Sequence, residues 1–295
     1  MSAVGREERG PVTAEVVVII PAHNAASTLP QQLAALDKQR GAPDFDVVVV
    51  DNRSSDGTGD LARAHGVRVI EAPDRGGVHY ARNVGAGATN QRVILHCDAD
   101  DVVDEGWLAA MTEQIQHFDI VGGALSFDRV NSQDDVVGLS PPAARQLPTC
   151  MGRRYAVGAN MGYRRTVWEA VGGFDESFVG GHEEVDFAWR AQSEGFSVGF
   201  APQAVVFYRQ RGTLVSLFRQ RFSYGSSFAQ LYSKHSHERI TRVSPRTEAR
   251  KVLTHFGRGP KVLVRRDTRR TWLMHTAWVL GRLRGDLRYK VRAPG

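Results

Sequence analysis

The sequence AEVVVIIPAHNAASTL (residues 14–29) decides the class of fold, because a continuous apolar run is followed at once by a polar turn and a helix start. Residues 14–20 are rich in β-branched side chains without polar alternation, which is typical of a strand buried on both faces. Ser27 or Thr28 can cap a helix whose leucines recur at helical spacing. These leucines are Leu29, Leu33 and Leu36. The stretch predicts one strand–helix unit of a parallel sheet.

The same alternation of strand and helix continues through the first two thirds of the chain. Apolar runs bounded by turn residues predict further strands at residues 46–50, 67–71, 93–97, 120–127 and 203–208. Helices are expected up to residue 64 and at residues 78–88, 105–117, 164–171 and 184–194. This order predicts an α/β fold with a mostly parallel sheet flanked by helices. Residues 128–157 contain three prolines and few apolar residues, so a long functional or mobile loop is expected there.

Length and composition limit the classes of protein to which the chain can belong. Its 295 residues, of which 42% are hydrophobic and 24% charged, suit one large or two small globular domains. The two cysteines, Cys97 and Cys150, exclude a disulfide framework and match no zinc site, so a reducing, cytoplasmic compartment is expected. The polar residues 1–12 lack a signal-peptide core and are expected to form a disordered tail. No run of about 18 apolar residues occurs, so no membrane-spanning helix is expected.

Charge divides the chain into an acidic body and a basic C-terminal segment. From residue 209 onward there are 21 Lys and Arg against 4 Asp and Glu, whereas residues 1–208 hold 17 basic and 28 acidic residues. The basic segment carries apolar residues at helical spacing, with an interruption expected near Gly225. Such a segment can cover the acidic body as a helical extension, lie on an anionic membrane surface or bind nucleic acid. No nucleic-acid motif accompanies it, so nucleic acid is the least favoured partner.

Polar residues follow three of the predicted strands, at the edge where parallel α/β sheets bind ligands. They are Pro21-Ala22-His23-Asn24 after the first strand, residues 51–57 after the second and Asp98-Ala99-Asp100-Asp101 after the fourth. Carboxylates clustered after a buried strand favour a bound cation, and oxygen ligands suit Mg²⁺ or Mn²⁺. The alternative for Asp98 and Asp100 is an acidic turn that caps the next helix.

Six motifs occur along this sequence in an order that is more specific for a protein family than any one of them alone. They are VVVIIPAHNAASTL, DVVVVDNRSSDGT, ARNVGAGA, VILHCDADD, GGFDESF and GGHEEVDFAWR, and together they span roughly residues 15–212. In these motifs the chain resembles the family 2 glycosyltransferases of the GT-A fold. The resemblance implies a nucleotide-sugar donor, a divalent cation (Mg²⁺ or Mn²⁺) held by the DxD carboxylates, and inversion at the anomeric carbon.

The resemblance also implies a nucleoside site after the first two strands. After the first strand it would consist of Pro21, Ala22, His23 and Asn24. After the second strand, Asp51 would accept a hydrogen bond from the base, although an Asp at this place is also common as a turn former.

Four further residues are implied in binding the rest of the donor. Arg82 and Asn83 match the family's ARN segment and would contact the base or the phosphates, with a solvated helix face as the alternative. Asp100 would be the direct metal ligand. Asp98 would contact the sugar or ribose and contribute to the metal site.

On the acceptor side, the motif GGHEEVD would supply a carboxylate that removes a proton from the acceptor hydroxyl. Glu184 stands in the place of the family's catalytic Asp and is one methylene longer, while Glu183 precedes it, so the choice between the two stays open. Asp175 would bind an acceptor hydroxyl, and Trp189 would be either a core residue or an acceptor platform. Tyr208 stands where many relatives carry a metal-binding His, which predicts a cation held mainly by Asp100 and the donor diphosphate.

The sequence thus predicts a GT-A catalytic domain over residues 13–210 and a basic, mainly helical extension over residues 211–295. It is expected to move a sugar from a nucleoside-diphosphate donor, UDP first of all, to a hydroxyl of a glycan, lipid-linked or small-molecule acceptor. The alternatives are a sugar-phosphate nucleotidyltransferase, which the missing Gly-rich phosphate loop disfavours, and a non-catalytic binder of anionic surfaces or nucleic acid. The expected location is the cytoplasm, with peripheral contact at the inner face of the membrane through the basic segment.

Overall fold

The structure, a computed structural model, describes residues 15–136, 141–211, 213–236, 250, 252–254, 256–257 and 266–294. The tail expected at residues 1–12 lies outside these residues. The strands of the main sheet are β1 Val16–Ala22, β2 Phe45–Asp51, β3 Arg68–Glu71, β4 Val93–Cys97, β5 Val102–Val103, β6 Ile120–Ser126, β9 Asn160–Arg164 and β10 Val198–Phe207. The principal helices are α1 Leu29–Leu36, α2 Thr58–Ala64, α3 Val78–Gly87, α4 Trp107–Ile115, α6 Arg165–Val171, α7 Glu183–Ser193, α8 Leu214–Lys234 and α11 Arg266–Tyr289.

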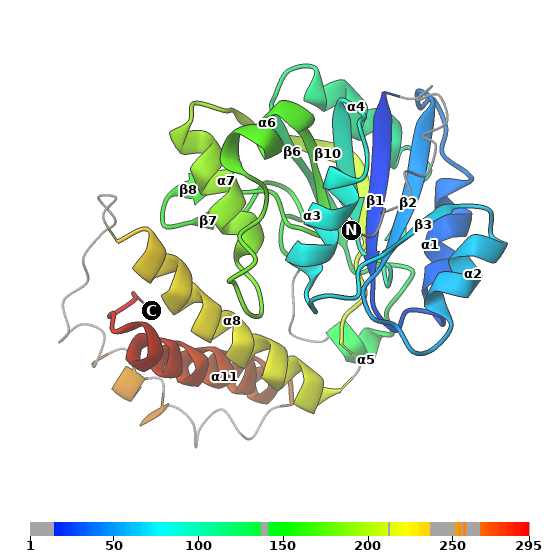
Figure 1. The fold of residues 1–295 in the computed structure, drawn as a ribbon. Coiled ribbons are helices and arrows are strands. Elements are labelled where there is room, and N and C mark those ends of the chain that lie inside the picture. The colour runs from blue at the N-terminus through cyan, green and yellow to red at the C-terminus, as the bar shows by residue number, and fades with distance from the viewer. Residues whose placement is uncertain are drawn as a thin grey trace, which may run out of the picture.

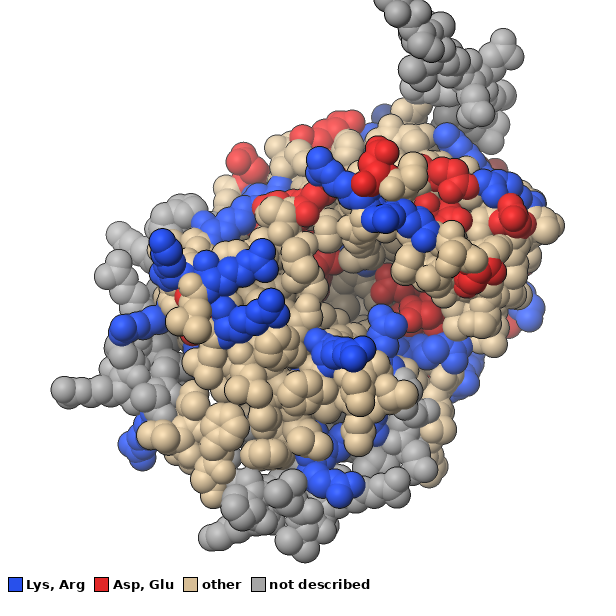
Figure 2. Space-filling model, turned by 60° about the horizontal axis from the view of Figure 1, so that its bottom comes forward, with Lys and Arg blue, Asp and Glu red and all other residues tan. Residues whose placement is uncertain are grey.

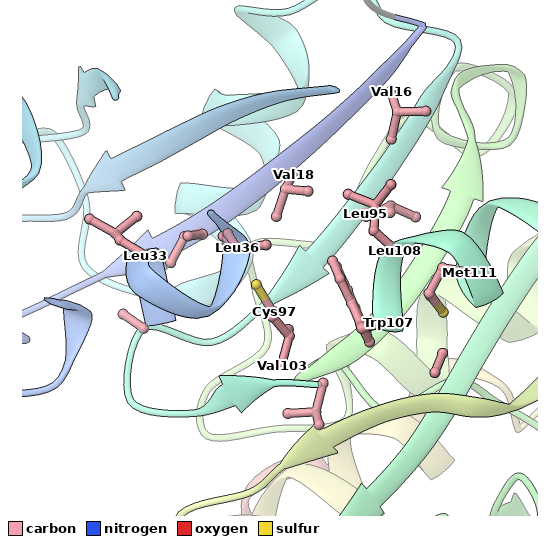
Figure 3. Close-up of a cluster of buried hydrophobic side chains, with 14 of the residues drawn as sticks. Val16, Val18, Leu33, Leu36, Leu95, Cys97, Val103, Trp107, Leu108 and Met111 are labelled. Atoms are coloured by element: carbon pink, nitrogen blue, oxygen red, sulfur yellow. The ribbon is translucent and has the colours of Figure 1, made fainter. Parts of the chain in front are cut away.

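The strands follow the order β3-β2-β1-β4-β9-β6-β10-β5 across a sheet with helices on both faces (Figure 1). β1 is buried along its whole length, as its continuous apolar run predicts. Val16 and Val18 pack with α1 and α4 on one face of the sheet, and Val17 and Ile19 pack with α3 and α7 on the other. Figure 3 shows the first of these clusters, with Trp107 of α4 among the strand side chains. The α/β fold class expected from the sequence is confirmed.

β9 is a strand that the sequence pattern did not reveal. It lies antiparallel between β4 and β6, in an otherwise parallel part of the sheet. Asn160 is fully buried, and its Nδ2 donates to the carbonyl oxygens of Ala124 (2.8 Å) and Ala204 (2.9 Å). Gly162 packs so tightly that a Cβ on it would lie 2.4 Å from Leu95 Cδ2. A buried Asn and a Gly interrupt the apolar run by which a strand is recognised, so the pattern fails here.

The loop expected over residues 128–157 is wrong in part, because its described residues include regular structure. α5 (Gln133–Val136) is a short helix, and β7 (Thr149–Cys150) pairs with β8 (Arg153–Arg154) in a small hairpin. β10 also begins before the expected residue 203. A bulge between Ala201 and Val205 allows both halves of β10 to pair with β6.

α8 and α11 form a closely packed parallel pair along the lower side of the molecule in Figure 1. A Cβ on Gly225 of α8 would lie 2.0 Å from the carbonyl oxygen of Trp278, and a Cβ on Gly281 of α11 would lie 1.9 Å from that of Phe222. The interruption expected near Gly225 is therefore wrong. α8 is continuous, and this glycine permits close approach of the two backbones. No helix in the described parts of the chain combines the length and the apolar character needed to cross a membrane.

α8 is fastened to α7 by a buried cluster of charges. The fully buried Asp186 carboxylate lies 2.8 Å from Arg190 Nε, Lys234 Nζ and His235 Nε2. Burial opposes ionisation of Asp186, but the hydrogen bond from His235 and the charge of Arg190 hold its pKa below the ordinary value. At the start of α7, His182 Nδ1 lies 2.7 Å from the Ser227 hydroxyl of α8. The basic segment therefore begins as an integral part of the sheet domain.

Candidate active site

A cavity of about 940 Å³ opens at the carboxyl ends of β1 and β4. It is lined by the turns after these strands, the start of α3, the loop into α7, and the segment from the end of β10 into α8. Its ionisable lining residues are His23, His79, Arg82, Asp98, Asp100, Glu183, Glu184, Tyr208, Arg209, Arg211, Arg219 and Tyr224. Of the three polar turns predicted to share one edge, those after β1 and β4 line this cavity, and the turn after β2 is hydrogen-bonded to the turn after β1. α8 adds a further wall.

The turn after β4 gathers three carboxylates. Ligand oxygens of Asp98, Asp100 and Asp101 lie within 4.8 Å of one another. Burial, and then the charge of neighbouring aspartates, raises the pKa of Asp100 and raises that of Asp101 well above its usual range. Asp101 Oδ1 accepts a hydrogen bond from the Arg209 amide (2.7 Å), whereas its Oδ2 is buried without a partner in the described chain. This set of hard oxygen donors fits Mg²⁺ or Mn²⁺, which would relieve the repulsion.

Arg82 connects the acidic turn with the start of α7. Its side chain is 3% exposed, and its two terminal nitrogens lie 3.2 Å from Asp98 Oδ1 and 3.2 Å from Glu183 Oε1. Burial disfavours the charge, but Asp98 and Glu183 hold the pKa of Arg82 above its usual value. A Cβ on Gly158 would lie 2.7 Å from this guanidinium, so a side chain at position 158 would collide with Arg82. Arg82 thus holds two carboxylates in place beside the cavity.

The two glutamates at the start of α7 differ in their surroundings. Glu183 is buried and ion-paired with Arg82. Glu184 lines the cavity, and no other described residue forms a hydrogen bond or ion pair with its carboxylate. Burial, and then the charge of Glu183, raises the pKa of Glu184 to about 8. A carboxylate without a partner and with such a pKa is suited to accept a proton near neutral pH, which favours Glu184 over Glu183 as the base.

A second chamber of about 490 Å³ adjoins the main cavity and shares with it residues of the turn after β1 and of the start of α3. The predicted nucleoside residues Pro21, Ala22 and His23 line this chamber, and Asn24 lines the main cavity. Asp51 is buried and lines neither space, and its carboxylate accepts a hydrogen bond from the Ser54 amide at 3.1 Å. The structure therefore brings the turn after β1 to the chamber and leaves Asp51 outside its lining.

Asn52 lines this chamber, and the sequence placed it in the polar turn after the second strand without indicating its role. Its Nδ2 donates to the carbonyl oxygens of Ala72 (2.8 Å) and Arg75 (2.6 Å), and its Oδ1 accepts from the Gly77 amide (2.9 Å). The Asn52 carbonyl oxygen lies 2.8 Å from His23 Nδ1. Asn52 thus ties together the turns that enclose the chamber. An Asn in a polar turn resembles an ordinary turn former, so the sequence alone gave no signal for this role.

Besides Asp51, three predicted site residues line neither the main cavity nor the chamber. Asn83 Nδ2 donates to the Phe174 carbonyl (2.8 Å), and its Oδ1 accepts from the Phe174 amide (2.9 Å). Asp175 lies 2.5 Å from Lys234 Nζ. Trp189 is 1% exposed and packs in the core between α7 and α8. These side chains hold elements together in the structure, and their binding roles stay predictions.

The end of β10 places one tyrosine and two arginines at the cavity. Tyr208 lines it at the position noted in the sequence, and burial raises the pKa of its hydroxyl well above the usual value. Arg209 is held by hydrogen bonds to the Asp100 carbonyl (2.8 Å) and Gln31 Oε1 (2.9 Å). Arg211 is exposed, and no described carboxylate is paired with it. The guanidinium of Arg209 thus donates to oxygens of the protein, whereas that of Arg211 is exposed at the cavity.

α8 supplies the wall that the sequence argument placed outside the catalytic domain. It contributes Ser216, Arg219, Gln220, Ser223 and Tyr224 to the cavity lining. Their spacing of three and four residues puts them on one face of the helix. No motif marks them, so only the packing of α8 against α7 reveals them. The boundary expected at residue 210 therefore runs through the lining of the cavity.

Comparison with known proteins identifies the family to which this sequence is similar. The sequence matches the family described as glycosyl transferase family 2 over residues 17–172, and glycosyl transferase family group 2 over residues 143–283. It is 30% identical over 247 residues to a pre-mycofactocin glycosyltransferase of Mycobacterium tuberculosis, covering 78% of this chain and 50% of the relative. It is 26% identical over 268 residues to the glycosyltransferase AglE of Haloferax volcanii, covering 87% of this chain and 86% of that one. The chain thus spans about half the length of the first relative.

Among solved structures, the fold is similar to that of the mannosyltransferase PcManGT from Pyrobaculum calidifontis in complex with GDP-Man and Mn²⁺. The TM-score is 0.66, and the match covers 92% of this chain and 87% of that one at 17% identity. At this identity the similarity concerns the fold alone. It confirms the expected GT-A architecture, including the C-terminal helical part.

Proposed function

Because the chain belongs to glycosyl transferase family 2, we propose that it transfers a sugar from a nucleoside-diphosphate donor to an acceptor hydroxyl with inversion. The observation that carries this proposal is the meeting, in one cavity, of a carboxylate cluster suited to a cation and a glutamate without a partner. The adjoining chamber of about 490 Å³ has room for a nucleoside beside that cluster.

On the donor side, the side chains are arranged to hold a diphosphate. Asp100 and Asp98 would bind Mg²⁺ or Mn²⁺, which would neutralise charge on the departing nucleoside diphosphate. Arg211, exposed at the cavity, adds a positive charge that can stabilise the leaving group. Arg82 keeps Asp98 in place and is not itself free to leave its two carboxylates.

On the acceptor side, Glu184 accepts the proton of the attacking hydroxyl. As the acceptor oxygen forms its bond to the anomeric carbon, the bond from that carbon to the diphosphate oxygen breaks, and the proton passes to the Glu184 carboxylate. A single displacement of this kind inverts the anomeric centre. Glu183 is ion-paired with Arg82, and its charge contributes to the raised pKa of Glu184.

We propose UDP as the first donor to test, with a glycan, lipid-linked or small-molecule hydroxyl as acceptor. Contact of α11 with an anionic membrane is part of this proposal, because Leu280, Leu283 and Leu287 are 40%, 38% and 83% exposed on its outer side. The nucleotidyltransferase alternative has no comparable support, since no Gly-rich phosphate loop follows β1.

The test is calorimetric titration with UDP, GDP, dTDP and CMP, each in Mn²⁺, in Mg²⁺ and in EDTA. We expect metal-dependent binding of one nucleotide by the wild type and its loss in Asp100→Ala. The matched control is Asp60→Ala, because the Asp60 side chain is 89% exposed on α2, away from the cavity. A folded wild type that binds none of the four nucleotides would overturn the proposed function.

A further inference from the structure

A separate pocket of about 450 Å³ lies between α8 and α11, beside the main cavity. It is lined by Val179, Phe218, Arg219, Phe222, Ser223, Ser226, Arg284, Arg288 and Tyr289. Arg219 and Ser223 line both this pocket and the main cavity, so the two spaces meet at one turn of α8. Val179 directly precedes the glycines that lead into Glu183 and Glu184. The pocket therefore adjoins the side of the cavity assigned to the acceptor.

The described lining of this pocket carries only positive charge. Among these lining residues are Arg219, Arg284 and Arg288, and none of them is an Asp or Glu. Within the described chain, none of these three guanidinium groups is ion-paired with a carboxylate. Arg284 lies over the Phe222 ring at 5.6 Å, a contact that leaves the guanidinium edge able to donate hydrogen bonds. Three unpaired guanidinium groups around one hollow are the complement of a phosphate.

The remaining walls of the pocket are apolar. Phe218, Phe222 and the 61% exposed Val179 supply this surface. One helical turn before Phe218, Leu214 and Val215 are 47% and 60% exposed and continue the same face of α8. In Figure 2 the lower half of the face shows uncharged residues with Lys and Arg, while Asp and Glu gather in the upper half around a hollow. A ligand that matches this surface is both anionic and apolar.

We propose that this pocket binds an amphipathic phosphate ester, in which the arginines hold the phosphate and the apolar face holds a hydrocarbon chain. This proposal rests on the proposed function and names the class of its acceptor. The ester would carry a hydroxyl-bearing group that reaches the main cavity past Ser223, where Glu184 accepts its proton. Free phosphate alone would use the arginines and leave the apolar walls uncovered, so it should bind more weakly than the ester.

The test uses dodecyl phosphate below its micelle concentration as the probe, measured by calorimetry on the full chain. The pocket variant is Arg284→Gln/Arg288→Gln, and the matched control is Arg68→Gln, an exposed arginine on β3 at the far edge of the sheet. We expect at least tenfold weaker binding of dodecyl phosphate to the pocket variant and unchanged binding to the control. Dodecyl maltoside, with the same chain and no charge, and inorganic phosphate should each bind at least tenfold more weakly than dodecyl phosphate.

Several outcomes would overturn the proposal. One is a pocket variant that binds dodecyl phosphate with an affinity within twofold of the wild type. Another is a wild type that binds dodecyl maltoside as tightly as dodecyl phosphate. If the wild type binds inorganic phosphate as tightly as dodecyl phosphate, the pocket is a site for a free anion instead. Binding of UDP with Mn²⁺ to the pocket variant should stay at the wild-type level, so failure here is distinct from failure of the proposed function. Val179→Glu is a second variant, which adds a repelling charge without altering a helix and should also weaken dodecyl phosphate binding at least tenfold.

Discussion

The main cavity and the pocket that adjoins it present two regions that carry opposite charges and hold them in opposite ways. The donor wall consists of Asp98, Asp100 and Glu183, with Glu184 at its acceptor end. These carboxylates lie at the ends of buried elements, and Asp98 and Glu183 pair with Arg82. The helical wall consists of Arg219 of α8 and Arg284 and Arg288 of α11, which are exposed and unpaired in the described chain. Preorganised charges are what a reaction centre needs, whereas exposed arginines can adapt to a ligand. The difference suggests chemistry on the donor wall and recognition on the helical wall.

The largest expected effect tests whether the chemistry belongs to the donor wall. Glu184→Gln removes the proposed base while keeping the size of the side chain, so we expect the turnover rate to fall by about 10³-fold. Nucleotide binding should be unchanged, because Glu184 is not part of the carboxylate cluster. The measurements are steady-state kinetics with the donor selected by calorimetry and titration of that nucleotide. Loss of nucleotide binding together with turnover would contradict the assigned role.

The pH dependence of the same residue sharpens this prediction. Glu184 must be ionised to accept a proton, and its pKa is raised to about 8, so kcat/KM should rise with pH and level off above about 8. The raised pKa has the opposite effect on stability. The folded chain holds this proton more tightly than the unfolded chain does, so the stabilising contribution of Glu184 is lost as pH rises from about 4.5 to about 8. Thermal melting of Glu184→Gln should lack that part of the pH dependence.

The next effect tests whether the donor wall depends on buried pairing. Arg82→Gln leaves Glu183 buried without its counter-charge, and removal of one partner from such a pair costs about 3 kcal/mol of unfolding free energy. Urea denaturation would measure this loss. The control is Arg63→Gln, whose partners Asp60 and Glu71 are exposed, and its denaturation midpoint should stay at the wild-type value. Equal midpoints for Arg82→Gln and wild type would show that the pair contributes nothing to stability.

The donor wall could be predicted from the sequence, and the helical wall could not. Asp98 and Asp100 follow an apolar run that ends in a turn, so their place at the sheet edge follows from local pattern alone. Arg284 and Arg288 belong to a segment with 21 Lys and Arg and no motif that distinguishes them. Only the packing of α8 against α11 brings them to Arg219.

Even on the donor wall, the sequence did not predict which side chains form ion pairs with one another. The pairing of Arg82 with Asp98 and Glu183 joins residues from α3, the turn after β4 and α7, and no local pattern encodes such a contact. This contact is what separates the roles of the two adjacent glutamates. The antiparallel β9 was missed for a related reason, since Asn160 is stabilised by distant carbonyl groups that only the folded sheet provides.

A smaller effect tests the packing that builds the helical wall. Gly281→Ala places a methyl group 1.9 Å from the Phe222 carbonyl oxygen, so the backbones must separate, at an expected cost of about 2 kcal/mol. The matched control is Gly87→Ala at the end of α3, where the nearest atom is Trp168 Cη2 at 4.0 Å. This control should be neutral or more stable by up to about 1 kcal/mol, because alanine favours helix. Urea denaturation separates the two variants, and a stability loss of similar size in both would rule out the packing explanation.

The smallest expected change in stability tests whether the outer side of α11 serves recognition. Leu283 and Leu287 are 38% and 83% exposed, so Leu283→Ser/Leu287→Ser should change the unfolding free energy by less than about 0.5 kcal/mol. Sedimentation with vesicles containing anionic lipid should nevertheless fall several-fold, because leucine side chains gain free energy by entering the membrane interface. Neutral vesicles serve as the reference, since the basic helical wall should bind them weakly in either form of the protein. Unchanged binding of the variant to anionic vesicles would mean that these leucines do not insert, and the arginines of the helical wall would then act on soluble acceptors.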